Sequence, residues 1–174
     1  MKVVHDKHDH GGMLVPPRPS DAHAWNGESW VADAALQQVM LRTQLAEWCS
    51  DIDRAADAAR WVIAGDPLRA LEYQQAAEDA RSFLDGGSVE GTVAPAVLAW
   101  VTPQRGATQA AEDIVAKASA FSRALLMLRS IRLQTKETIR LQADSLDIEA
   151  AQVSRDAGLA QIQGVIQEFS STSE

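Results

Sequence analysis

Apolar residues in the first half of the chain recur at alternating spacings of four and three. The helical pattern begins at about Asp33. Its apolar positions are Leu41, Leu45, Trp48, Ile52, Ala55, Ala59 and Val62. Such spacings place residues at the a and d positions of a heptad, on one face of a helix. The pattern predicts a long helix that packs lengthwise on another helix, in its own chain or in a second copy. Trp61 lies close to this face, so core packing is expected for it too.

One helix is expected to end and the next to begin at Gly65-Asp66-Pro67. Glycine suits the C′ position, aspartate the N-cap, and proline the first helical turn. The second helix should extend to about Leu84. Its apolar face comprises Tyr73, Ala77, Ala80 and Leu84. A short apolar plug, from Ala94 to Trp100, follows after a loop. Residues 32–106 are therefore predicted to form a helical hairpin and a short plug helix.

The remaining residues, 107–174, form the longest helical pattern, with Thr108 as the expected N-cap. Its apolar face comprises Ile114, Ala118, Phe121, Leu125 and Leu128. The pattern weakens beyond Ile139, and Asp144 with Asp147 resembles a second N-cap. A break is therefore predicted near residues 143–147. The final helix would bury Ile148, Leu159, Ile162, Ile166 and Phe169.

Residues 1–31 differ from the rest and are predicted to form an extended arm rich in proline and histidine. Within it, Asn26-Gly27 is the preferred pair for a type I′ turn, which would place His23 opposite Trp30 in a small β-hairpin. Trp25 and Trp30 are large aromatic residues outside the long helices. They are expected to dock the arm, either on its own domain or on a partner.

Composition supports a helical fold. Hydrophobic residues make up 46% of the 174 residues, but aromatic residues only 5%, so alanine and aliphatic side chains must supply most of the core. This suits close helix packing. The expected fold class is all-α: a long-helix bundle or helical hairpin with an extended N-terminal arm and a small β-hairpin. The sequence contains no run of about eighteen apolar residues, so we expect no membrane partner.

Basic residues line one face of the longest predicted helix, where Arg129, Arg132, Lys136 and Arg140 recur at spacings of three and four. This face could bind nucleic acid, or it could be a solvated or partner-facing side matched to acidic residues. The formal net charge of −8 and the lack of interleaved aromatic residues favour the second interpretation. Nucleic acid is therefore not an expected partner.

Candidate metal ligands occur in the arm, where His5, His8 and His10 alternate with Asp6 and Asp9. These residue types bind divalent metals, but an extended arm holds them in place only if several copies converge on an axis. Solvated histidines are the alternative. Phosphate-binding loops, nucleophile elbows and zinc-protease motifs are all missing from the sequence. We expect a protein that is not an enzyme and needs no cofactor.

Two stretches carry a resemblance to known proteins. Residues 53–83 contain D-A-A-R and G-D-P-L-R-A-L-E-Y, and residues 94–140 contain A-P-A-V-L-A-W, Q-A-A-E-D-I and I-R-L-Q-T-K. The arm adds P-P-R-P-S-D-A-H-A-W-N-G-E-S-W. In these features the chain resembles a family of small α-helical tail proteins of tailed phages and prophages, which are tail-fibre-associated or tail-fibre assembly proteins. It departs from the family at Ala94-Pro95, where paired prolines are more frequent.

The resemblance implies a structural protein of the phage virion, in the tail, baseplate or fibre region. Such a protein would form a homo-oligomer, for example a trimer, through its helices, and its arm would dock on other tail or fibre proteins. It would be made in the cytoplasm of the host bacterium and end in the virion. The alternative is a tail-fibre assembly chaperone that is absent from the mature virion. The resemblance implies no catalytic residues.

Overall fold

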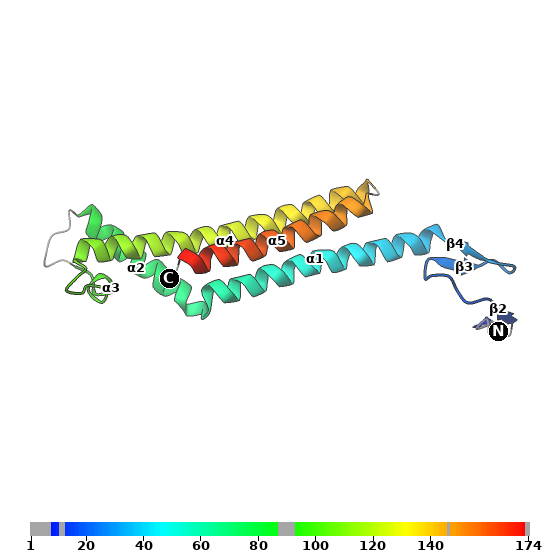
Figure 1. The fold of residues 1–174 in the computed structure, drawn as a ribbon, viewed down its shortest axis with the longest axis horizontal. Helices are drawn as coiled ribbons and strands as arrows, with labels where there is room; N and C mark the ends of the chain where they lie inside the picture. Colours follow the sequence, from blue (N-terminus) through cyan, green and yellow to red (C-terminus); the bar gives the residue numbers. More distant parts are fainter. Residues whose placement is uncertain (1–7, 11–12, 87–92, 146, 173–174) are drawn as a thin grey trace. The chain divides into compact units, whose positions relative to one another are not determined.

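A computed structural model describes residues 8–10, 13–86, 93–145 and 147–172, and it is mostly α-helical (Figure 1). The helices are α1 (Ala34–Ala64), α2 (Pro67–Asp85), α3 (Pro95–Leu98), α4 (Ala107–Asp144) and α5 (Ile148–Thr172). The prediction of a helical fold with a small β-hairpin is confirmed. The chain forms two compact units, residues 1–48 and 49–174, so the boundary between them lies within α1.

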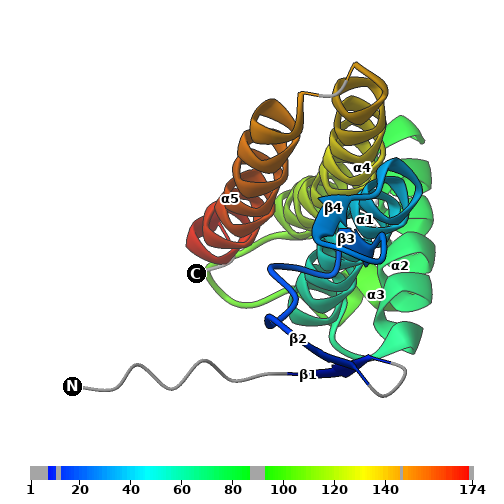
Figure 2. The ribbon, with the colours of Figure 1, turned by 90° about the vertical axis from the view of Figure 1, so that its right-hand side faces the viewer.

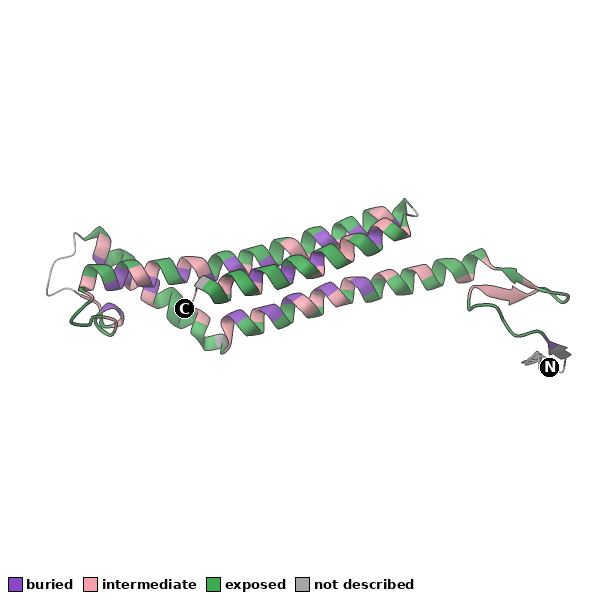
Figure 3. Ribbon diagram, viewed as in Figure 1, coloured by how far each residue is buried: buried purple, intermediate pink, exposed green. Residues whose placement is uncertain are grey.

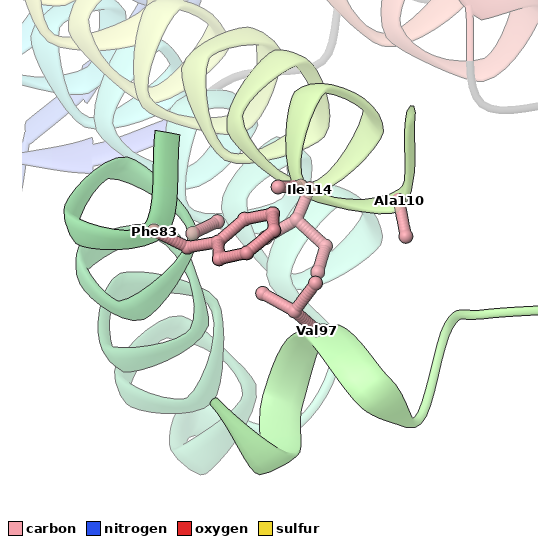
Figure 4. Packing of buried hydrophobic residues seen from close by; sticks show 6 residues of the cluster. Phe83, Val97, Ala110 and Ile114 are labelled. Atoms are coloured by element: carbon pink, nitrogen blue, oxygen red, sulfur yellow. The ribbon is translucent and has the colours of Figure 1, made fainter. Parts of the chain in front are cut away.

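The second unit is built around α4 and α5, which lie side by side as an antiparallel pair (Figure 2). Helix α2 packs on the first turns of α4, and the four-residue α3 packs on both. Phe83 of α2, Val97 of α3, and Ala110 and Ile114 of α4 meet in one buried cluster (Figure 4). Because alanine leaves room for close backbone approach, the aromatic-poor composition is sufficient to fill this core. Helix α3 is therefore the plug that the sequence predicts.

The α1–α2 connection agrees with the sequence prediction. Gly65 has a φ of +60°, which favours glycine over other residues. The Asp66 carboxylate accepts a hydrogen bond from the backbone N–H of Leu68 at 2.8 Å, and Pro67 occupies the first turn of α2. The chain thus passes from α1 to α2 through a tight, fully capped turn.

The ends of α4 differ in detail from the prediction. The helix begins at Ala107 with Gly106 as its N-cap, so Thr108 is already helical and does not cap it. The predicted break is confirmed, because α4 ends at Asp144 and α5 begins at Ile148. The capping residue of α5 is Asp147, whose carboxylate accepts a hydrogen bond from the N–H of Ala150 at 3.0 Å.

The first unit contains two small antiparallel hairpins ahead of α1. Strands β1 (His8–His10) and β2 (Met13–Val15) form one, which the sequence analysis did not predict. Strands β3 (His23–Trp25) and β4 (Trp30–Ala32) form the other. The predicted register of this second hairpin is wrong, because Trp25 lies opposite Trp30 and His23 lies opposite Ala32.

The register differs because the loop has four residues and is not a two-residue type I′ turn. The side-chain oxygen of Asn26 accepts hydrogen bonds from the N–H groups of Glu28 and Ser29 at 2.9 and 2.8 Å. These bonds close a wider loop, in which Gly27 has a positive φ of 103°. After β4, the carboxylate of Asp33 caps α1 by accepting from the N–H of Ala35 at 2.8 Å. The predicted helix start is therefore confirmed.

None of the described helices combines the length and the apolar character that crossing a lipid bilayer requires.

Candidate interaction surfaces

The apolar positions predicted to share one face of α1, from Leu41 to Val62, are called the α1 stripe below, and they differ in how far they are buried. Trp48 and Ile52 are buried, whereas Leu41 and Leu45 are only half-buried. Every residue from Ala34 to Glu47 is half-buried or exposed, and the buried positions of α1 all fall between Trp48 and the end of the helix (Figure 3). The predicted stripe therefore includes, in the first unit, a segment whose side chains are not buried.

Towards the end of α1 the buried face departs from the predicted one. The buried residues are Ala56, Ala59 and Ile63, whereas Val62 is 62% exposed and Trp61 is 66% exposed. The placement of Val62 and Trp61 in the core is therefore wrong. A strict heptad drifts against the 3.6-residue turn of a straight helix, and the drift moves the core position from Val62 to Ile63.

The stripe predicted on α4 lies mostly inside the second unit. Ile114, Phe121 and Leu128 are buried, and Leu125 is half-buried. The Phe121 ring packs edge-to-face on Tyr73 of α2 and Phe169 of α5, with ring centroids 5.4 and 6.4 Å apart. These side chains hold α2, α4 and α5 together and are not available as a free surface. Tyr73, which was expected on the buried face of α2, is 38% exposed.

A layer of ion pairs joins α1 to α4 and α5 within the second unit. Two guanidinium nitrogens of Arg155 donate hydrogen bonds to one carboxylate oxygen of Asp51 at 3.0 and 2.5 Å. Both side chains are about a quarter exposed, at 28% and 21%. The hydrogen bond from Arg155 lowers the pKa of Asp51 below its ordinary value and, reciprocally, raises the pKa of Arg155.

The basic face of α4 takes part in the same layer. Lys136 donates to the carboxylate of Asp53 at 2.5 Å, and Arg132 lies 3.6 Å from the other oxygen of that carboxylate. Arg140 lies 3.5 Å from Glu137 on its own helix. Two of the four basic residues therefore face an acid of α1, as the second interpretation of this face requires. Sequence analysis did not identify Asp53 as that acid, because it lies 83 residues from Lys136.

Trp25 and Trp30 pack on each other within the first unit. Their rings meet edge-to-face with centroids 5.5 Å apart, and the indole N–H of Trp30 donates to the carbonyl of Pro16 at 2.7 Å. Arg18 lies over the Trp30 ring and donates to the carbonyl of His23 at 2.8 Å. The proline-rich segment is thus fastened to the hairpin, and both tryptophans remain half-exposed.

The candidate metal ligands are only partly described. His5 lies outside the described residues. His8 and His10 lie in β1, where they pair with Val15 and Met13. Within the described residues, no group of three or more His, Cys, Asp or Glu side chains is arranged to hold a metal ion.

The chain matches no family model, no curated protein and no solved structure. The resemblance to phage tail proteins therefore rests on the sequence motifs alone.

Proposed function

We propose that the protein is a structural subunit of a phage tail, in the tail, baseplate or fibre region. It joins copies of itself and neighbouring tail or fibre proteins, without catalysing a reaction. The self-association is supported by one observation, the half-exposed start of the α1 stripe. The assignment to the tail rests on the motif resemblance. In this proposal the protein is made in the cytoplasm of a bacterial host and is incorporated into the virion.

The geometry of α1 supports association through Leu41 and Leu45. They precede Ile52 by about three and two helical turns, so all three lie on one helix face. An amphipathic helix gains most of its stability by burying its apolar face, and Ala34–Glu47 contains no buried side chain. A helix from another subunit laid along this segment would continue the packing that begins at Trp48. A cyclic oligomer such as a trimer satisfies this arrangement.

The hairpin of β3 and β4 supplies a second contact in this proposal. Its tryptophans are held by their mutual packing and by the Pro16 and Arg18 contacts, so a partner would meet a preformed surface. Preformed aromatic surfaces lose little conformational entropy on binding. Trp25 and Trp30 are the residues that would dock on a neighbouring tail or fibre protein.

The second candidate is an assembly chaperone that binds tail-fibre chains transiently. Leu41 and Leu45 are half-buried rather than fully exposed, a state that a protein tolerates without a permanent partner. In this alternative the same helix face binds a client and then releases it.

Sedimentation of the purified chain tests the association face. The variant L41E/L45E is expected to sediment as a smaller species than the wild-type chain, with unchanged helicity, because the substituted face is already half-exposed. The matched control is V39E/M40E, which alters two exposed apolar residues of the same turns that lie off the stripe. The proposed face is refuted if both double variants sediment like the wild-type chain, or if both dissociate equally.

Quantitative mass spectrometry of purified virions separates the two functions. A structural subunit is expected at a small symmetric multiple per particle. A chaperone is expected in the infected-cell lysate but not in virions. Absence from both would contradict the phage assignment.

A further inference from the structure

The corner between α1 and α2 exposes an unusual amount of apolar side chain. Trp61 and Val62, in the last turn of α1, are 66% and 62% exposed, and Leu68 and Leu71, in the first turns of α2, are both 63% exposed. Single exposed apolar residues are common on protein surfaces. Four large ones in an eleven-residue span that contains the α1–α2 turn are typical of a surface that binds another protein. Trp is also among the residues most enriched at the centres of interfaces.

The corner is preformed. The N–H of Gly65 donates to the carbonyl of Trp61 at 2.9 Å, and the N–H of Arg69 donates to the carbonyl of Asp66 at 3.0 Å. Together with the side-chain cap of Asp66, these bonds order the end of α1 and the start of α2 on either side of the turn. A partner would therefore meet the exposed side chains on a rigid support, and binding would not have to order a loop.

A hollow lies beside the exposed tryptophan. It is lined by Asp57, Arg60, Trp61, Ala64 and Gly65. The small residues Ala64 and Gly65 leave the space open, and Trp61 forms one of its walls. A large projecting side chain and an open hollow thus adjoin each other on one corner of the molecule.

We propose that this corner binds the same corner of a second copy of the chain, in a contact with two-fold symmetry. In such a contact each surface must be complementary to itself, so that residue i meets residue j and residue j meets residue i. A knob beside a hollow meets this requirement, because the Trp61 indole of each copy enters the hollow of the other. Because the contact uses the same surface of both copies, it joins two copies and leaves no equivalent surface for a third.

The charges at the hollow have the same self-complementarity. Asp57 and Arg60 form an ion pair within the chain, one turn apart on α1. A two-fold rotation brings Asp57 of one copy next to Arg60 of the other, so that the four charges alternate in sign around the contact. This inference draws on the self-association that we propose as part of the function, but it uses residues separate from Leu41 and Leu45.

The test uses the full-length L41E/L45E chain, so that the other proposed face does not contribute. This chain is expected to form dimers in sedimentation experiments over a concentration series. Adding W61E should weaken the dimer at least 100-fold, whereas adding L126E should leave it unchanged. Leu126 is the matched control because it is also 66% exposed and lies on α4. A monomeric L41E/L45E chain, or equal effects of the two additions, would overturn the inference.

Exchanging the charges of Asp57 and Arg60 distinguishes a specific contact from non-specific hydrophobic association. D57R should weaken the dimer because it places two arginines together, and D57R/R60D should restore it. Failure of the exchange to restore association would show that the proposed charge arrangement is wrong.

Cross-linking provides a test that leaves Leu41 and Leu45 native. In a C49S background, a mixture of D57C and R60C chains should form a disulfide-linked heterodimer, because the proposed contact places residue 57 of one copy next to residue 60 of the other. V153C, at a position 63% exposed on α5, is the control and should not. Equal cross-linking of the D57C and R60C mixture and of V153C, or none between positions 57 and 60, would exclude the contact even if the Leu41 and Leu45 face fails its own test.

Discussion

A close approach of α4 and α5 gives a prediction whose size follows from the structure. Gly158 of α5 is buried against Thr135 of α4, itself only 8% exposed. A Cβ added at Gly158 would lie 2.5 Å from the methyl carbon and 2.6 Å from the hydroxyl oxygen of Thr135. Both distances are far below van der Waals contact, so Gly158→Ala must push the helices apart or force Thr135 from its rotamer. Overpacking of this kind costs about 1–3 kcal/mol.

Helix propensity opposes this cost, because alanine is more favourable than glycine by about 1 kcal/mol in a helix. The control is Gly164→Ala on the same helix, where an added Cβ meets nothing within 4 Å and only the propensity gain remains. We therefore expect the Gly158 variant to be less stable than the Gly164 variant by about 1–3 kcal/mol. Urea unfolding followed by circular dichroism measures both free energies.

A double-mutant cycle tests whether the Thr135 side chain causes the loss of stability in the Gly158→Ala variant. In a Thr135→Ala background the two clashing atoms are gone, and the remaining Cβ would lie 3.1 Å from the new one. Gly158→Ala should then lose most of its penalty, giving a coupling energy of about 1–3 kcal/mol. Equal effects of the two glycine substitutions, or a penalty that persists without the Thr135 side chain, would refute the proposed packing of α4 on α5.

Three further predictions concern single contacts. Asp51→Asn should destabilise the chain by about 1–2 kcal/mol at pH 7, because it removes the charged acceptor of two Arg155 hydrogen bonds and leaves Arg155 paired with Asp156 alone. Since the folded pKa of Asp51 is lowered, this contribution should be present above the ordinary value of 3.8 and be lost as pH falls through the lowered pKa, which acid titrations of both chains would show. Asp66→Ala should cost about 1 kcal/mol in thermal or urea unfolding through loss of the α2 cap. Trp30→Phe removes the hydrogen bond to Pro16 and should raise amide hydrogen exchange in the β3–β4 hairpin, with unchanged exchange in α5.

Features determined by neighbouring residues could be predicted from the sequence. The start of α1 near Asp33, the turn at Gly65 and Asp66, and the break between α4 and α5 each depend on a few adjacent residues. Glycine, proline and aspartate restrict the backbone there in known ways. The long helices follow from apolar periodicity, which is also a local property.

Features determined by distant residues were missed or misplaced. The register of the β3–β4 hairpin is a local exception, because two hydrogen bonds from Glu28 and Ser29 to Asn26 widen the loop, whereas the Asn-Gly pair alone indicated a two-residue turn. The acid facing Lys136 came from α1, and sequence distance gave no sign of this pairing.

The same limit applies to the candidate interaction residues. Periodicity places Leu41, Leu45 and Ile52 on one face of α1, but it does not show which of them the chain's own helices cover. The exposure of Val62 was missed because a drift of one residue along the helix moves the core position to Ile63, and Trp61 lies two residues from both Ala59 and Ile63.

Hydrogen exchange at several protein concentrations tests the central claim, that other subunits cover the first half of α1. We expect amide protection in Ala34–Glu47 to increase as concentration is raised through the association range, while protection in α5 stays constant. Protection in Ala34–Glu47 that does not change while the chain demonstrably associates would contradict the claim, because another surface would then hold the copies together.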